Sequence, residues 1–596
     1  MGFYNDALSK IYSEDDDFLI IGLTGRTGSG CSTVSNILSS KSSEIKHSLF
    51  NGDYPKSNEE RKERVLFKYF SVSWVPFIKI QASSILTLCL SKDFDGKLNK
   101  FIREVTGLGD DQRILESTVN ELKSILKEIK AKDESSDHDI DDKIEFINKY
   151  LIEANAKIKS IFKNKADYIK LYQAIGNNYR SSGMYHDNSF SDEFHGFFLP
   201  KKINDIIQRI RFLTKEKNTK TGENKSIYIV IDAIRNPFEA TYFQDRYSSF
   251  YLMAVSTEEH YRHQRLREQG LTDAEIKDVD AKEYRKSSLD EKLSYIYQNI
   301  QSCLEISDIY VENPEEENVV CRYSGLANQL IKFTSLMKRP GIITPSNVER
   351  CMQIAYTAKL NSGCISRQVG AAVSDSSFSI KSIGWNDVPS GQVPCSLRDR
   401  FDLSEGFDDI AYSEFEKNEN SFIRNIDKTK IIFSDVKSKG MRAPFCFKTE
   451  WNNVLDDKYK EDLRVEHKLS DDEFDIISKI KSNANQVFTR SLHAEENAFL
   501  QISKYGGVGI QNGFLFTTAS PCELCSKKAY QLGIKQIYYI DPYPGIAMRN
   551  ILNSGSNKPL LKIFNGAIGK AFHNFYTPRM AYKDELSARS REYKYR

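Results

Sequence analysis

Two short stretches decide the fold of the C-terminal half of this 596-residue chain: Leu-His-Ala-Glu-Glu at residues 492–496 and Pro-Cys-Glu-Leu-Cys at residues 521–525. They contain an imidazole at His493 and two thiols at Cys522 and Cys525. A catalytic zinc site takes three protein ligands of this kind and keeps a fourth position open for water. The spacing therefore predicts one Zn²⁺ bound by these three side chains.

H-x-E followed by P-C-x-x-C is the signature of zinc-dependent nucleobase deaminases. Zinc lowers the pKa of a bound water to about 7. Glu495 stands two residues after the histidine, so it can carry a proton from that water to the substrate ring and the leaving ammonia without binding the metal. A structural zinc knuckle would need two more ligands nearby, and Cys525 is the last cysteine in the chain. A redox C-x-x-C would leave His493 and Glu495 without a role. We therefore predict that Glu495 is the catalytic residue.

The flanking sequence predicts the fold that holds this site. Residues 513–518 and 534–540 are typical of buried strands, and residues 493–502 have a helical apolar pattern. Cys522 would open a second helix, where free backbone N–H groups and the helix dipole favour a thiolate. We expect a cytidine deaminase-like α/β/α three-layer domain, with the metal between two helix N-termini laid over a sheet.

The segment upstream narrows the substrate class. Residues 364–373 predict a strand after a polar turn, and a second strand at 379–383 runs into the turn Gly-Trp-Asn-Asp-Val-Pro-Ser-Gly at 384–391. Here the chain resembles deoxycytidylate deaminases, which share C-x-x-R-x-V-G-A and G-Y-N-x-x-P-x-G patterns. The resemblance implies that Asn386 hydrogen-bonds the deoxyribose or base and that Arg367 approaches a phosphate. The alternatives are a plain turn residue for Asn386 and an exposed arginine at a strand start for Arg367.

A long polar stretch at residues 394–490 separates this turn from His493 and exceeds what a compact deaminase needs. We expect it to cap the pocket or to build an oligomer interface. Helices are predicted within it at 456–468 and 471–481. Some deoxycytidylate deaminases carry a second, structural zinc, and Cys395, Cys446 and His467 could form part of one. Free cysteines in a reducing compartment are the alternative.

The N-terminal half predicts a different domain. A short apolar strand at residues 17–24 runs into Gly-Arg-Thr-Gly-Ser-Gly-Cys-Ser-Thr at 25–33 and then into an apolar-periodic helix. This matches the P-loop pattern G-x-x-x-x-G-K-[ST] except that Cys31 replaces the lysine. The backbone can still cradle phosphates and Ser32 can face a Mg²⁺, but phosphoryl transfer loses a charge. A structural glycine turn is the alternative. The predicted nucleotide-binding residues are Gly25, Gly28, Ser29, Gly30, Cys31, Ser32, Thr33 and Asp232.

Further signals support a P-loop NTPase-like parallel-sheet domain. Residues 225–232 form a continuous apolar run that ends in Asp232, like a Walker B strand, and residues 307–312 predict one more strand. Residues 233–239 and 251–255 resemble nucleoside-monophosphate kinase-like P-loop proteins. A later cluster looks like a lid or phosphate clamp: Arg262, Arg265 and Arg267. We expect this kinase-like domain at residues 1–335 and the deoxycytidylate deaminase domain at 336–596.

Composition limits the partners. Lys and Arg number 84 against 82 Asp and Glu, and the net charge of +2 argues against a large nucleic-acid-binding surface. The most apolar stretch, residues 70–90, is interrupted by Pro76, Lys79 and Gln81, so it is no membrane span. The acidic run at residues 14–17 does not suit a secretory signal. We expect a cytoplasmic protein whose partners are small nucleotides and further copies of itself, without membrane attachment.

The two halves together resemble the anti-phage deoxycytidylate deaminases of bacteria, in which a P-loop kinase-like domain precedes the deaminase. The resemblance implies zinc-dependent conversion of dCTP or dCMP to dUTP or dUMP plus ammonia, which would deplete the pool that phage replication needs. An alternative is a polynucleotide cytosine or adenine deaminase, which would want a basic groove with aromatic platforms. A second alternative is a nucleotide-responsive binding protein without catalysis.

Overall fold

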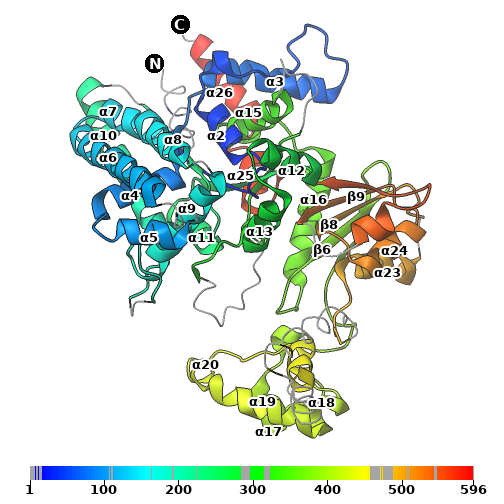
Figure 1. The fold of residues 1–596 in the computed structure, drawn as a ribbon. Coiled ribbons are helices and arrows are strands. Elements are labelled where there is room, and N and C mark those ends of the chain that lie inside the picture. Colours follow the sequence, from blue (N-terminus) through cyan, green and yellow to red (C-terminus); the bar gives the residue numbers. More distant parts are fainter. Residues whose placement is uncertain are drawn as a thin grey trace. The chain divides into compact units, whose positions relative to one another are not determined.

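The computed structural model describes Ala7, Ile11 and residues 17–594, apart from residues 107, 109–111, 163, 191–192, 223–224, 284–294, 315–322, 457–469, 471–472, 474–487, 507–508 and 542–546. The chain divides into two compact units (Figure 1). The first unit is Met1–Pro345 together with Asn565–Arg596, and the second is Ser346–Phe564. Among the described residues, no helix has an apolar run long enough to cross a bilayer.

The first unit is built on a six-stranded sheet in the order β11-β5-β4-β1-β3-β2. Neighbouring strands are parallel except for the antiparallel pair β11 and β5. The strands are β1 (Phe18–Thr24), β2 (Ile78–Gln81), β3 (Ile227–Asp232), β4 (Phe250–Ser256), β5 (Ile309–Glu312) and β11 (Gly566–Ala567). Leu19 and Ile21 point into one core and Ile20 into another. Both faces are thus covered, which explains the continuous apolar runs of the central strands.

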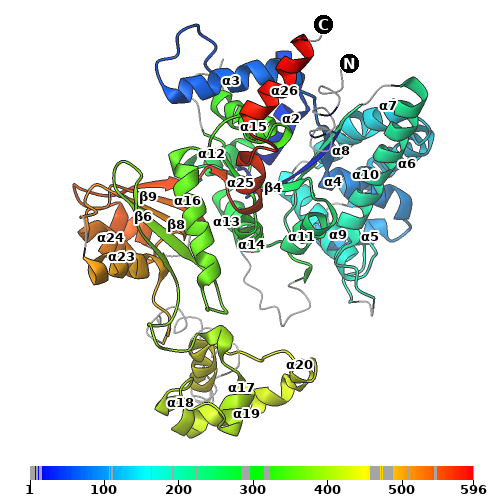
Figure 2. The same cartoon turned by 180° about the vertical axis from the view of Figure 1, so that it is seen from behind.

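Helices on both faces build these two cores (Figure 2). One face carries α4 (Ala82–Asp93), α5 (Leu98–Val105), α6 (Gln112–Ser136), α7 (Ile140–Glu145), η3 (Phe146–Tyr150), α8 (Leu151–Ile161), α9 (Lys165–Ser181), α10 (Phe198–Thr221) and α11 (Pro237–Arg246). The other carries α2 (Cys31–Ser39), α3 (Asn58–Ser73), α15 (Ser324–Lys338) and α25 (Gly569–Tyr576). The remaining helices are η1 (Ser42–Glu44), α12 (Glu259–Glu268), α13 (Asp273–Glu283), α14 (Ile300–Glu305) and α26 (Tyr582–Lys594).

The observed division differs from the expected boundary at residues 335 and 336, because the end of the chain returns to the first unit. β11 pairs with β5, with Ala567 opposite Ile309. Helix α25 then buries Phe575 against Tyr251, with ring centroids 5.0 Å apart. Burial of this helix on the first sheet stabilises the return, since an aromatic side chain is worth about 1.5–3 kcal/mol when buried.

The second unit is built on a five-stranded sheet in the order β10-β9-β8-β6-β7. The strands are β6 (Gly370–Ser374), β7 (Ile380–Trp385), β8 (Phe514–Ala519), β9 (Gln536–Asp541) and β10 (Leu560–Ile563). β8, β9 and β10 are parallel, and β6 is antiparallel to both β7 and β8. Residues 364–369, predicted as part of the first strand, lie outside it.

Helices cover both faces of this second sheet. Ala371 and Val373 pack with α23 (Ala494–Tyr505) and α24 (Glu523–Gln531). Gly370 points to the opposite face, where α16 (Asn347–Ala358) approaches so closely that a Cβ would lie 2.0 Å from the Ala355 carbonyl oxygen. Because neighbouring strand residues point to opposite faces, this arrangement is a three-layer α/β/α unit.

The long stretch before His493 has a small core of its own, centred on Tyr412, Phe422 and Phe445. Its short helices are α17 (Arg400–Glu405), α18 (Glu414–Asn418), α19 (Asn420–Ile432) and α20 (Ser434–Ser438), after the 3-10 turn η7 (Cys395–Leu397). The helices predicted at 456–468 and 471–481, and with them His467, fall almost entirely outside the described residues.

Candidate active site

His493 is held at the start of α23, where it occupies the N-cap position. The residue before it is tied to the turn after β7, because the Leu492 N–H donates to the Asp387 carbonyl at 2.8 Å. One turn into the helix, Asn497 Nδ2 donates to the Trp385 carbonyl at 3.0 Å. These two bonds fix the orientation of the helix that carries both His493 and Glu495.

Gly384 lets this helix lie against the sheet. A Cβ at this position would lie 2.3 Å from the Ala494 carbonyl oxygen and 2.4 Å from the Ala498 nitrogen. Both are backbone atoms, so no rotamer change could make room. The glycine therefore sets how closely α23 approaches β7.

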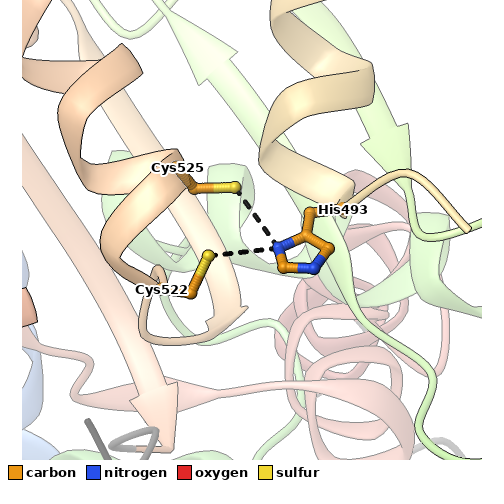
Figure 3. A group of neighbouring side chains, drawn as sticks. All are labelled: His493, Cys522 and Cys525. Carbon is orange, nitrogen blue, oxygen red and sulfur yellow. Dashed lines mark hydrogen bonds between the residues drawn. The ribbon is translucent and has the colours of Figure 1, made fainter. Parts of the chain in front are cut away.

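The two cysteines begin the other helix of the site. β8 ends at Ala519, and Cys522 is the N-cap of α24, with Cys525 in its first turn. The Cys522 and Cys525 sulfurs lie 3.2 and 3.5 Å from His493 Nδ1 (Figure 3). The three side chains point toward one another from two helix starts, and their ligand atoms all lie within 4.8 Å of one another.

The chemistry of this donor set fits Zn²⁺. Both thiols are buried. The hydrogen bond from Cys525 lowers the pKa of the Cys522 thiol to about 4, and the bond with His493 acts in the same direction. Facing that thiolate raises the pKa of Cys525. One imidazole nitrogen and two sulfurs are the ligands of a three-ligand catalytic zinc site, and the metal requires thiolates.

Glu495 is the acidic side chain buried at this site, with 4% of its surface exposed. The Thr517 hydroxyl donates to the Ala519 carbonyl at 2.7 Å, and its oxygen lies 3.3 Å from the Glu495 carboxylate. Burial raises the pKa of Glu495, while its own backbone N–H, His493 and Cys525 act in the opposite direction. A buried carboxyl in the first turn of α23, beside the three ligand atoms, can take up and release a proton there. A cavity of about 200 Å³ beside His493 is lined by residues 489–493, Glu496 and Leu524.

Asn386 and Arg367, predicted to contact substrate, are both engaged within the protein. The Asn386 amide accepts from the Val369 N–H at 2.7 Å and donates to the Arg367 carbonyl at 2.7 Å. Its oxygen also accepts from Ser362 at 2.9 Å. The Arg367 guanidinium pairs with the fully buried Asp541. These contacts brace the turn after β7 and the entry to β6, and direct binding of substrate by either residue stays a prediction.

Sequence reasoning did not single out Thr517 or Asp541. Thr517 lies in the strand Phe-Leu-Phe-Thr-Thr-Ala, and a polar residue in so apolar a strand is the signal that could have marked it. Asp541 ends β9 in the same way.

The glycine-rich loop of the first unit lies between β1 and α2, as expected for residues 25–33. Gly28 and Gly30 have φ of 88° and 111°, a backbone region that favours glycine. Asp232 ends β3 and accepts from the Ser35 hydroxyl at 3.1 Å. Burial raises the pKa of the Cys31 thiol to about 12, so this side chain stays neutral.

The remaining loop residues predicted to bind nucleotide differ in exposure. Ser29 is buried, Ser32 is exposed, and Thr33 is partly buried. Gly25 packs tightly, since a Cβ there would lie 2.6 Å from the Val255 carbonyl oxygen.

Comparison with known proteins identifies the class of the site in the second unit, at His493, Cys522 and Cys525. The family model of the cytidine and deoxycytidylate deaminase zinc-binding region matches residues 345–541. The C-terminal half thus carries a zinc-binding domain of this deaminase type, which supports Zn²⁺ at the site and a mixed α/β fold.

The relatives include phage deoxycytidylate deaminases and a bacterial protein. The chain is 29% identical over 194 residues to the deoxycytidylate deaminase of Enterobacteria phage T2, which covers 32% of this chain and 78% of that protein. It is 44% identical over 54 residues to ComE operon protein 2 of Bacillus subtilis (strain 168), covering 9% of this chain and 28% of that protein. The dCMP deaminase of cyanophage S-TIM5, solved with dCMP and dUMP, is 20% identical and covers 37% of this chain and 99% of its own, with a TM-score of 0.20. A likeness at that score carries no weight for the fold.

Proposed function

We propose that the second unit catalyses hydrolytic, zinc-dependent deamination of deoxycytidine nucleotides. The observation that carries the proposal is the convergence of His493, Cys522 and Cys525 within 4.8 Å, with Glu495 buried beside them. Homology to phage deoxycytidylate deaminases, at modest identity, supports nucleotide deamination. In the reaction, the bond between C4 and the exocyclic nitrogen breaks, a water oxygen adds to C4, and ammonia leaves.

Each side chain has a defined part in this chemistry. His493 Nδ1 and the two cysteine sulfurs would hold Zn²⁺, which supplies an activated water at neutral pH when bound. Glu495 would take a proton on its carboxylate and return it to the ring nitrogen and the leaving group. The Thr517 hydroxyl, held by the Ala519 carbonyl at 2.7 Å, lies 3.3 Å from the Glu495 carboxylate and can accept a hydrogen bond from it when Glu495 is protonated. Burial of Glu495 keeps bulk water from competing for the proton.

Ammonia release from dCMP, dCTP, CTP and a cytosine-containing oligonucleotide, measured in parallel, tests the proposal. We expect release from dCMP or dCTP and little from CTP or the oligonucleotide. Release from the oligonucleotide alone would support the polynucleotide editor instead. No release from any substrate by zinc-loaded protein would support a binding protein without catalysis.

We infer a second role for the glycine-rich loop of the first unit: binding a nucleoside triphosphate and controlling deamination. The loop follows β1, its glycines have positive φ, and it leads into the nine-residue helix α2, whose N-terminal N–H groups suit phosphate. Coupling between two sites is usually worth about 1–3 kcal/mol. The deamination rate measured with added ATP, GTP, dTTP or dUTP tests this role, and a rate that none of them changes contradicts it.

We also propose that this deamination depletes the deoxycytidine nucleotide pool and so acts as a defence against phage. It follows from the order of the two halves and the proposed reaction. Phage replication in cells that carry the wild-type chain or its Glu495→Gln variant tests it, and equal replication in both contradicts it.

A further inference from the structure

The start of helix α2 offers free hydrogen-bond donors. No side chain caps the helix at Gly30, and its first turn contains no acidic residue. Within the part of the chain that the structure describes, the N–H groups of Cys31 and Ser32 have no acceptor. Free donors together with the positive end of the helix dipole favour an anion at this position.

One anion already lies on the preceding loop, and it belongs to the protein itself. Glu283 is the last residue of α13 and is completely buried. Its carboxylate accepts from the Thr27 N–H at 3.0 and 3.3 Å, and from the Thr27 hydroxyl. Arg235 donates to the same carboxylate at 2.8 Å. A backbone N–H, a hydroxyl and a guanidinium that converge on two oxygens are also the groups that hold phosphate oxygens in proteins.

Arg235 supplies the positive charge that the loop lacks at Cys31. It follows β3 in the chain and also donates to the Thr27 hydroxyl at 2.9 Å. Its charge reaches the Cys31 thiol, where it partly opposes the rise in pKa that burial causes. A cation is therefore present beside the loop although the lysine of the P-loop pattern is absent.

Helices α12 and α13, which contact each other, are labelled in Figure 1, and Glu283 at the end of α13 binds the loop at Thr27. A Cβ at Gly28 would lie 3.0 Å from Leu266 Cγ of α12, so this helix packs directly on the loop. The two helices share a small core, formed by Leu266, Leu271, Ile276 and Val279, and Ile169 of α9 packs against both this core and one of the main cores.

Acidic side chains of the same two helices also neutralise the arginines over the loop. Arg262 donates to Glu259 at 2.9 Å and to Asp280 at 2.8 Å. Arg26 pairs with the same two acids, at 2.9 Å from Asp280. Of the three arginines predicted for a phosphate clamp, Arg262 and Arg267 thus bind carboxylates, whereas Arg265 donates to the Asn313 carbonyl at 3.4 Å.

Asn313 provides an independent sign that the loop lacks a ligand here. It is 1% exposed, and its Nδ2 donates to the Ser29 carbonyl at 2.9 Å. Its Oδ1 has no hydrogen-bond partner among the described residues. The amide lies against Gly30, since a Cβ there would be 2.1 Å from Nδ2. An unpaired buried acceptor is costly, so this position calls for a hydrogen-bond donor, which a sugar hydroxyl or base amino group of a nucleotide can supply and a phosphate oxygen cannot.

We propose that Glu283 occupies a phosphate subsite formed by Thr27 and Arg235, and that a nucleoside triphosphate binds the loop in competition with this carboxylate. The inference rests on the proposed nucleotide-binding role of the loop and adds its regulation. With Glu283 in place the subsite is closed. A triphosphate displaces the carboxylate because it brings more acceptor oxygens and more negative charge to the same donors.

Equilibrium binding of a fluorescent ATP analogue with Mg²⁺ to the full chain tests the proposal. Glu283→Gln removes the competing charge and keeps the shape, so we expect affinity to rise roughly tenfold. Glu283→Asp withdraws the carboxylate by one methylene and should give a smaller rise. The matched control is Glu275→Gln near the other end of α13, whose carboxylate accepts from the Thr272 N–H at 2.8 Å, and it should leave affinity unchanged. Adding Arg235→Gln to Glu283→Gln should abolish the gain.

The outcomes separate the two proposals. If wild type binds the analogue and neither Glu283 variant binds it more tightly, Glu283 does not compete with the nucleotide. The proposal that the loop binds a nucleotide is then retained. If Glu275→Gln tightens binding as much as Glu283→Gln, loosening of α13 explains the gain and the proposal fails. If no variant binds the analogue, both the competitor and the nucleotide-binding role are wrong. A cooperative thermal transition in each variant is required, and Glu283→Asp serves if Glu283→Gln does not fold.

Discussion

The metal site of the second unit and the glycine-rich loop of the first unit differ in whether side chains of the protein already occupy the ligand position. In the second unit, His493, Cys522 and Cys525 converge and leave room for a metal that none of them replaces. In the first unit, donors of the glycine-rich loop and its arginine are already bound by Glu283. The site of the second unit is complete apart from its metal, whereas the site of the first unit is closed by a group of the protein. The arrangement in the second unit suits constant catalysis, and the arrangement in the first unit suits control.

The largest effect that sharpens this contrast should come from the double variant Cys522→Ala/Cys525→Ala. Two of three ligands are lost, so we expect bound zinc to fall from about one per chain to near none, with no measurable deamination. Metal analysis of purified protein checks this. Cys351→Ala, a buried cysteine on α16, is the control and should retain the metal. Unchanged zinc in the double variant would refute the ligand assignment.

Next in size is the loss expected from Glu495→Gln. The amide cannot carry a proton, so deamination should fall about 10²–10⁴-fold with zinc content unchanged. Glu523→Gln removes the same charge between the two cysteines and should have a far smaller effect. Loss of zinc in Glu495→Gln would assign the residue a structural role, and retained activity would contradict the proposed mechanism.

A smaller effect is expected when Gly384 becomes alanine. The added Cβ meets backbone atoms of α23 and must displace the helix that carries His493 and Glu495. Overpacking of this kind costs about 1–3 kcal/mol, and a shift of about 1 Å in a catalytic group costs roughly 10²-fold in rate. Thermal unfolding and deamination rate check the two effects. The control Gly509→Ala has open space around its Cβ. If Gly384→Ala equals wild type, the close approach does not position the site.

The smallest effect should follow from blocking the loop with Gly30→Val/Ser32→Ala. A valine at φ 111° is strained and its Cβ meets Asn313. We expect the variant to lose the response of deamination to nucleoside triphosphates, a change of roughly 5–150-fold. Gly222→Val is the matched control, with φ 72° and open space, and should keep the response. Equal responses in both variants would make the first unit a scaffold.

The strands that lead into the two sites could be predicted from sequence, because the pattern that defines each strand lies within a few consecutive residues. The strand before the glycine-rich loop and the strand before Cys522 are continuous apolar runs, and both lie where expected as β1 and β8. The zinc ligands were predicted from spacing alone, since a strand end and two helix starts fix their positions.

Other features depend on contacts between residues far apart in the chain. Thr27 and Glu283 are 256 residues apart, and no pattern links them. β11 is only two residues long, so no apolar run in the sequence predicts that the chain returns to the first sheet. α10 extends to Thr221 through residues 216–221, where no apolar residue marks a helix in the sequence. Asn386 turns inward to hold Val369 and Arg367, which a turn motif cannot reveal.

The most direct test of the central claim is the reaction of zinc-loaded wild-type protein with dCMP or dCTP in ¹⁸O-labelled water. Hydrolytic deamination predicts a deoxyuridine nucleotide that carries the label on the base, with ammonia released in equal amount. The same reaction with Glu495→Gln should yield almost no labelled product. A product without the label, or ammonia release that persists at the wild-type rate in the variant, would contradict the account of the second unit.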